Sequence, residues 1–151
     1  MWFVNGVAQK TKGDEPTGDD MGDSLYEGYR PAVRFAGAKP HPGRLDESAA
    51  MSAIKPPPVT YTPTISPDAI ESGALSDAAL ENIAYAGQSH QQFLEPDAKG
   101  VAYRRGFFIG DGTGAGKGRQ VAGVIADNWN QGRKKHVWVS EKTPLLEDAR
   151  R

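Results

Sequence analysis

Mainly apolar residues recur at helical spacing in two stretches of the second half of the chain. The first stretch follows Ser76, a favourable N-cap, and predicts a helix from about Asp77 to Gln92. The second predicts a helix from about Lys117 to Asn130, with Gly132 ending it. The expected inner faces are Leu80, Ile83, Ala84, Gly87 and Gln91 in the first helix, and Val121, Val124, Ile125 and Trp129 in the second.

Two short apolar runs have the pattern of buried strands. Residues 107–109 (Phe-Phe-Ile) lie between two glycines, and residues 136–140 follow Lys134 and Lys135. A strand, a crossover helix and a second strand imply a parallel pair, and therefore an α/β sheet. Thr143 and Pro144 then open a further helix, because proline fits the first turn. Trp138 is expected in the core, as is Trp129.

The first 74 residues lack this periodicity. Nine of the eleven prolines precede Ala69, and residues 8–24 are polar, glycine-rich and acidic. Such a composition cannot bury enough apolar surface to offset the entropy of ordering the chain. We therefore predict a disordered or extended Pro/Gly-rich arm over residues 1–74, with one or two helical turns at 46–53. The ordered domain is expected to begin at residue 75 and to run to 151.

The composition excludes several classes of protein. The net charge of the 151 residues is −1, so no overall charge indicates a nucleic-acid or membrane partner. The chain has no cysteine, which excludes a disulfide scaffold and a cysteine–zinc site. No run is long enough to span a membrane. We expect a cytoplasmic chain with no membrane contact.

The strongest chemical signal lies between the first predicted strand and the second helix. Glycine occupies every second position from Gly110 to Gly118, and Gly116 precedes Lys117. A strand, a glycine loop ending in Gly-Lys and a helix are the setting of a phosphate-binding loop, where backbone N–H groups and a lysine bind phosphate oxygens. Lys117 is the predicted catalytic residue. The predicted nucleotide-binding residues are Asp111, Gly112, Thr113, Gly114, Ala115, Gly116, Lys117, Gly118 and Arg119. The predicted fold class is α/β, a partial P-loop NTPase (RecA-like) parallel sheet preceded by the disordered arm.

Two other interpretations of this loop remain open. The strict phosphate-loop pattern has glycine where Asp111 stands and a hydroxyl where Gly118 stands, and that hydroxyl is the usual protein ligand of Mg²⁺. The loop also fits the dinucleotide pattern G-x-G-x-x-A, with Glu141 as a candidate ribose-binding acid, although such a site has little use for Lys117. A nucleotide-binding or scaffolding remnant without hydrolysis is the other alternative.

Three segments resemble the strawberry notch family, namely residues 75–88, 106–119 and 132–140. The resemblance covers about residues 75–151 and implies a superfamily 2 helicase-like ATPase. In bacteria and phages such ATPases occur in large proteins, often fused to DNA methylase domains. The resemblance therefore implies ATP and Mg²⁺ as ligands. In the complete protein it also implies DNA, the remaining helicase core and a methylase domain as partners. The glycine at position 118 is expected in this family.

The same resemblance marks two differences. A glutamine that helps to recognise adenine is usual at the position of Ala79, so Gln88 or Gln91 is left as a substitute. The acidic strand-end motif and the arginine finger of such enzymes are expected beyond Arg151, and we therefore expect no ATP hydrolysis by residues 1–151 alone.

The basic clusters and the histidines give weaker signals. The basic clusters are Arg104-Arg105, 133–136 and Arg150-Arg151, and the usual explanation for such clusters is a solvated surface. In a helicase-like protein, residues 140–143 are a candidate contact with the DNA backbone. The three histidines lack metal-ligand spacing.

Overall fold

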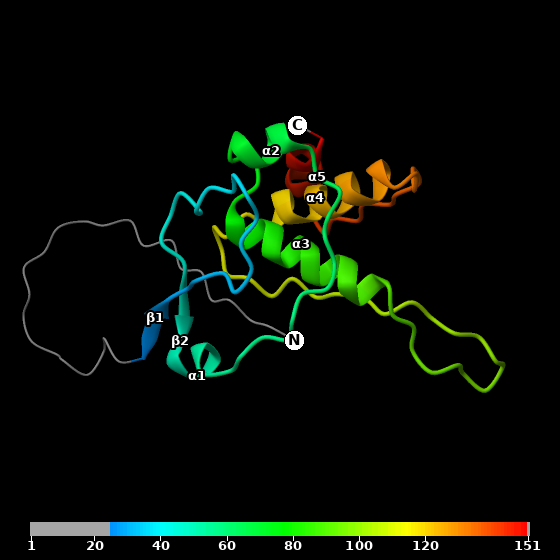
Figure 1. Ribbon diagram of the computed structural model, residues 1–151. Coiled ribbons are helices and arrows are strands. Elements are labelled where there is room, and N and C mark those ends of the chain that lie inside the picture. Colours follow the sequence, from blue (N-terminus) through cyan, green and yellow to red (C-terminus); the bar gives the residue numbers. More distant parts are fainter. Residues whose placement is uncertain (1–24, 151) are drawn as a thin grey trace, which may run out of the picture.

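The computed structural model describes residues 25–150 (Figure 1). In chain order the elements are β1 (Tyr26–Gly28), β2 (Asp46–Ser48), α1 (Ala49–Ser52), α2 (Pro67–Glu71), α3 (Asp77–His90), α4 (Lys117–Asn130) and α5 (Thr143–Ala149). The prediction of disorder at residues 8–24 lies outside the described residues. No helix in the described part of the chain has the length and apolar character needed to cross a membrane.

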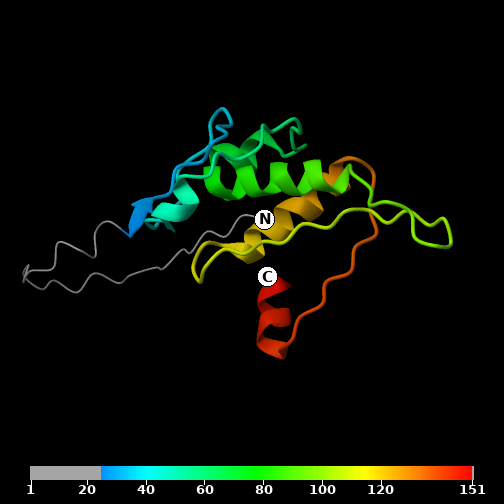
Figure 2. The ribbon, with the colours of Figure 1, turned by 90° about the horizontal axis from the view of Figure 1, so that it is seen from below.

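The two long helices α3 and α4 pack side by side at the centre of the molecule (Figures 1 and 2). Both were predicted, and their starts are confirmed. The hydroxyl of Ser76 accepts a hydrogen bond from the backbone N–H of Ala79 (3.2 Å), and Gly132 has a φ of 86° just after α4. The helices approach closely because a Cβ at Gly123 of α4 would lie 2.3 Å from Ile83 Cδ1 of α3.

The core lies on α3. Its buried cluster consists of Leu75, Ala79, Leu80 and Ile83. The partly buried residues around it are Phe35, Ala38, Ile65, Ile70 and Val124. Four of these five come from the stretch that was expected to be a disordered or extended arm. Part of that stretch therefore supplies the cover that the inner face of α3 requires.

Polar contacts also hold parts of residues 25–74 to the two long helices. The expected helical turn is α1, and residues 55–66 are extended as expected, but they lie along α3 and α4. Tyr61 Oη donates to Asp127 Oδ2 (2.6 Å), and the Tyr61 ring occupies the space where a Cβ at Gly87 would be. Tyr29 Oη donates to Glu81 on α3.

The predicted parallel sheet is not present in the described residues. The sheet that is present there is the antiparallel pair β1–β2, with Tyr26 opposite Ser48. Residues 107–109 and 136–140 are extended but form no strand. Val137 and Val139 are 89% and 86% exposed, and Figure 2 shows this segment leaving α4 on its way to α5. An extended segment becomes a strand only beside another strand, and residues 25–150 place no strand next to these segments.

The prediction for the buried face of α4 is also wrong in part. The buried residues of α4 are Gln120, Gly123 and Asp127, whereas Trp129 is 48% exposed and is not a core residue. Trp138 is only half-buried. The polar side of α4 faces inward because Gln120 and Asp127 find hydrogen-bond partners on α3, in the loop before α4 and in residues 61–64.

Candidate phosphate-binding site

The glycine loop ends directly at the start of α4. Gly114 and Gly116 have φ values of 91° and 77°, a backbone conformation that favours glycine. Gly116 is the N-cap of α4, and no side chain accepts a hydrogen bond from the first turn of the helix. The free N–H groups and the positive end of the helix dipole at Lys117–Arg119 are therefore open to an anion.

Lys117 lies across the same loop. Its exposed side chain donates from Nζ to the carbonyl oxygens of Asp111 and Gly112, both at 2.9 Å. Both acceptors are neutral, whereas hydrogen bonds from an ammonium group to a charged oxygen are shorter and about twice as strong. A phosphate at the loop would therefore compete successfully for Lys117.

Asp111 takes part in the site through its carbonyl rather than its carboxylate. The carboxylate is half-buried and accepts from Asn82 Nδ2 of α3 (3.0 Å) and Gln120 Nε2 of α4 (2.6 Å). Burial raises the pKa of Asp111, against the hydrogen bond from Gln120 and the charge of Lys117, which lower it. Sequence reasoning missed Asn82 and Gln120. The sequence marks them only by position: Asn82 precedes Ile83, a predicted core residue, and Gln120 follows Arg119, a predicted binding residue.

The predicted loop residues separate into an exposed and a buried group. Thr113, Gly114, Lys117, Gly118 and Arg119 are exposed, and Gly112 is partly so. Ala115 is buried and its carbonyl oxygen accepts from Gln120 Nε2 (3.1 Å). A Cβ at Gly118 would meet nothing within 4 Å, so the site has room for the hydroxyl that this chain lacks.

A cleft of about 300 Å³ opens beside the loop. Residues 114–116 form one wall, and Ser76 and Ala79 at the start of α3 form another. The rest of the lining comes from His41, Pro42, Gly73 and Ala74 in the segments before α3 and from Arg119 on α4. Gln88 does not reach it, because its side chain binds Thr60 and the carbonyl of Pro58, and Gln91 is exposed and does not line it. The structure thus places neither proposed substitute for a glutamine at position 79 in this cleft.

The described residues contain no ready-made cluster of side chains for a metal ion. No group of three or more acidic or histidine side chains among residues 25–150 is arranged to hold a metal ion. The one carboxylate of the loop, that of Asp111, is already bound to Asn82 and Gln120. Gly118, at the position of the usual hydroxyl ligand, has no side chain to bind Mg²⁺.

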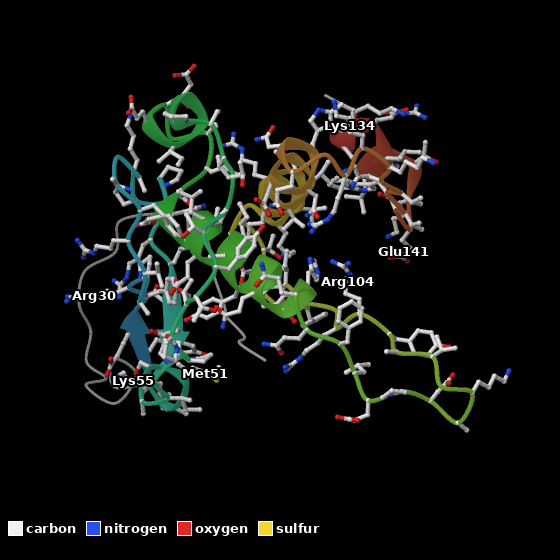
Figure 3. The ribbon with its side chains drawn as sticks, turned by 45° about the vertical axis from the view of Figure 1, so that its right-hand side comes forward. Arg30, Met51, Lys55, Arg104, Lys134 and Glu141 are labelled. Carbon is white, nitrogen blue, oxygen red and sulfur yellow. The ribbon has the colours of Figure 1, made fainter. Side chains whose placement is uncertain are left out.

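The basic segment 133–136 lies at the other end of α4. Lys134 Nζ lies 5.2 Å from the centre of the Trp129 ring, and the His136 ring stacks on the same tryptophan at 6.5 Å. Figure 3 shows Lys134 and Glu141 near this end of the molecule, on the segment leading to α5. Arg104, labelled in the same view, donates to the carbonyl of His90 (3.0 Å). These side chains do not line the cleft beside the loop.

Comparisons with known proteins identify the family of the chain. Residues 40–151 match the family described as P-loop containing NTP hydrolase pore-1. The chain is 41% identical over 148 residues to Protein FORGETTER 1 of Arabidopsis thaliana and 42% identical over 139 residues to Protein strawberry notch of Drosophila melanogaster. It is 46% identical over 126 residues to human Protein strawberry notch homolog 2.

These matches cover 98%, 91% and 83% of the chain but only 11%, 8% and 9% of the relatives, so the chain spans about a tenth of their length. No solved structure matches the chain. The family match begins at residue 40, inside the expected arm, and includes the loop and both long helices. The chain belongs to the strawberry notch family, with a P-loop NTP hydrolase domain over residues 40–151.

Proposed function

We propose that this chain is the ATP-binding part of a strawberry notch-type, superfamily 2 helicase-like ATPase that acts on DNA. The observation that carries the proposal is the uncapped start of α4 behind a glycine loop, with Lys117 lying across that loop. The family match to P-loop NTP hydrolases supports it. The phosphates of ATP would bind at residues 111–119.

The proposed binding step exchanges one set of partners for another. Lys117 leaves the carbonyl oxygens of Asp111 and Gly112 and donates to phosphate oxygens. The free N–H groups at the start of α4 donate to the same phosphates. The dinucleotide alternative is less favoured, because it assigns no role to Lys117 at this position.

The base of the nucleotide would occupy the cleft beside the loop. The cleft shares residues 114–116 with the phosphate site, so one ligand can reach both. Ala79 presents only a methyl group there, and the polar side chains that line the cleft are those of His41, Ser76 and Arg119. Base recognition in this chain would therefore depend on the arm as well as on α3.

The proposed parallel sheet requires strands that the described residues do not supply. Val137 and Val139 are exposed and Trp129 is half-exposed, so apolar side chains are available for such a sheet to cover. The relatives are about ten times longer than the chain, which supports the proposal that other parts of a longer protein pair with residues 107–109 and 136–140. Those parts would also supply the ligands for Mg²⁺ and the groups for hydrolysis, and residues 140–143 would contact DNA.

A nucleotide-binding protein without hydrolysis is the second candidate function. It is favoured by one feature of the loop, namely that Gly118 stands where the phosphate-loop pattern has the hydroxyl that binds Mg²⁺. Both candidates predict ATP binding by the loop. They differ in whether a longer protein containing this chain hydrolyses ATP.

Replacing Lys117 with alanine should weaken ATP binding by about tenfold or more, because charge-assisted hydrogen bonds contribute roughly 1.5–3 kcal/mol. Isothermal titration calorimetry on the 151-residue chain measures the affinity. Lys99→Ala is the matched control, since Lys99 is an exposed lysine outside the site. The phosphate-site proposal is wrong if Lys117→Ala binds ATP as tightly as Lys99→Ala.

Replacing His41 with alanine should distinguish binding of the base from binding of the phosphates. We expect ATP to bind several-fold more weakly to His41→Ala, because the variant loses one of the three polar side chains that line the cleft. Inorganic tripolyphosphate, which has no base, should bind as it does to the parent chain. His136→Ala serves as the control. Equal weakening of both ligands would contradict the base site and would indicate a change in the loop itself.

A further inference from the structure

Three side chains tie the glycine loop to both long helices. Asp111, at the start of the loop, accepts from Asn82 Nδ2 (3.0 Å) and Gln120 Nε2 (2.6 Å). Asn82 Nδ2 also donates to Gln120 Oε1 (3.1 Å), which closes a triangle of hydrogen bonds. Gln120 Nε2 donates once more, to the carbonyl oxygen of Ala115 (3.1 Å). The triangle therefore joins α3, the first turn of α4 and two points of the loop.

These bonds use all the donor hydrogens of the two amide groups. Each side-chain amide has two N–H donors. Asn82 directs its donors to Asp111 and Gln120, and Gln120 directs its donors to Asp111 and Ala115. Gln120 is only 1% exposed, so water cannot replace a partner that is lost. One arrangement of the three side chains is thus favoured over the others.

The arrangement matters because glycine gives the loop great conformational freedom. Glycine loses more freedom on ordering than any other residue, and it occupies every second position from 110 to 118. Asp111 and Ala115 are the two fixed points, and the exposed Thr113 and Gly114 lie between them. The network also engages the carboxylate of Asp111, which would otherwise be free to approach an anionic ligand.

We propose that Asn82 and Gln120 are positioning residues for the phosphate loop, which they hold in its binding conformation through Asp111 and Ala115 before a triphosphate arrives. A loop that is already ordered loses less conformational entropy on binding, so its affinity is higher. The identity of the ligand rests on the proposed function. The ordering of the loop by Asn82 does not, and it can be measured without any ligand.

The test exchanges the two partners for side chains of the same shape. Asn82→Asp removes the donor and places a second carboxylate next to that of Asp111, and like charges at this distance repel. In the double variant Asn82→Asp/Asp111→Asn, the amide at position 111 can donate to the carboxylate at position 82. Gln88→Ala is the control, because Gln88 is also on α3 but binds Thr60 and Pro58 of the arm.

Two quantities are measured on the 151-residue chain. The first is the NMR order parameter of the backbone amides of Gly112, Gly114 and Gly116 without ligand. The second is the affinity for inorganic tripolyphosphate. Asn82→Asp should lower the order parameters and weaken tripolyphosphate binding by about tenfold or more. The double variant should recover part of both, because it restores the bond between positions 82 and 111 but not the bond to Gln120 Oε1. Gln88→Ala should change neither.

Each outcome decides a separate point. Order parameters that stay at the parent value in Asn82→Asp overturn the proposal, as does a double variant no better than the single one. If Asn82→Asp does not fold, Gln120→Met, which keeps the length of the side chain but has no donor, is measured in its place. If the parent chain binds neither tripolyphosphate nor ATP, the proposed function fails, and the order parameters still decide whether Asn82 and Gln120 order the loop.

Discussion

Replacing Glu81 with alanine is expected to lower the free energy of unfolding by about 3 kcal/mol. Glu81 is 2% exposed on α3, where it accepts hydrogen bonds from Tyr29 Oη and from the backbone N–H of Ala32 (2.8 Å). Alanine would leave both donors without a partner and would leave a cavity. Urea unfolding, followed by circular dichroism, measures the change.

Glu81→Gln is the matched variant for this position. It keeps the shape of the side chain and an oxygen for the Ala32 N–H, so its loss of stability at neutral pH should be much smaller than that of Glu81→Ala. A loss as large as that of alanine would show that the charge of Glu81, rather than its hydrogen bonds, stabilises the fold. Equal stability of the parent and Glu81→Ala would contradict the role of this contact in holding the arm.

Comparing the parent chain with Glu81→Gln should also show how the free energy of unfolding depends on pH. Burial raises the pKa of Glu81 above its ordinary value of 4.5, against the hydrogen bonds from Tyr29 and Ala32, which lower it. The folded chain therefore binds this proton more readily than the unfolded chain. The stability of the parent relative to Glu81→Gln should be highest below pH 4.5, fall as the pH rises through the raised folded pKa, and then stay constant.

Replacing Asp127 of α4 with alanine is also expected to lower the free energy of unfolding by about 3 kcal/mol. Asp127 is 1% exposed on α4 and accepts from Tyr61 Oη (2.6 Å), the backbone N–H of Thr64 (2.6 Å) and Gln131 Nε2 (2.8 Å). Two of these donors belong to the arm. The variant should therefore release residues 55–66 as well as destabilise the chain.

Two measurements on Asp127→Ala check this expectation. Urea unfolding gives the stability, and limited proteolysis within residues 55–66 reports the release of the arm. The control is Asn128→Ala, one residue along the same helix, whose side chain binds the carbonyl of Val124 and the side chain of Arg133. If Asp127→Ala is no less stable and no more rapidly cleaved than Asn128→Ala, the buried carboxylate does not anchor the arm.

The carboxylates of Glu81 and Asp127 also support the candidate site. The residues that they hold belong to the stretch 25–74, which also supplies His41 and Pro42 to the cleft beside the loop. Glu81 is adjacent to Asn82, whose side chain binds Asp111. In the proposed function, the arm is therefore part of the nucleotide-binding domain rather than a linker in front of it.

Local sequence patterns alone predict the elements around the site. The helices that start after Ser76 and at Lys117, and the glycine positions of the loop between them, follow from rules that act within a few residues. Such rules include capping, helical periodicity and the conformational range of glycine. The candidate phosphate-binding residues could therefore be named before the fold was known.

The partners of these elements depend on contacts between residues that are far apart in the sequence. The polar side of α4 faces inward because Gln120 and Asp127 form hydrogen bonds with residues outside the helix. The pattern of residues within α4 cannot reveal that these partners lie nearby. Residues 25–74 pack on α3 and α4 because Glu81 of α3 and Asp127 of α4 accept hydrogen bonds from them, although their composition predicts a disordered or extended chain. The apolar segments 107–109 and 136–140 form no sheet because a strand needs a neighbour, and hydrogen bonds between strands depend on residues far away in the sequence.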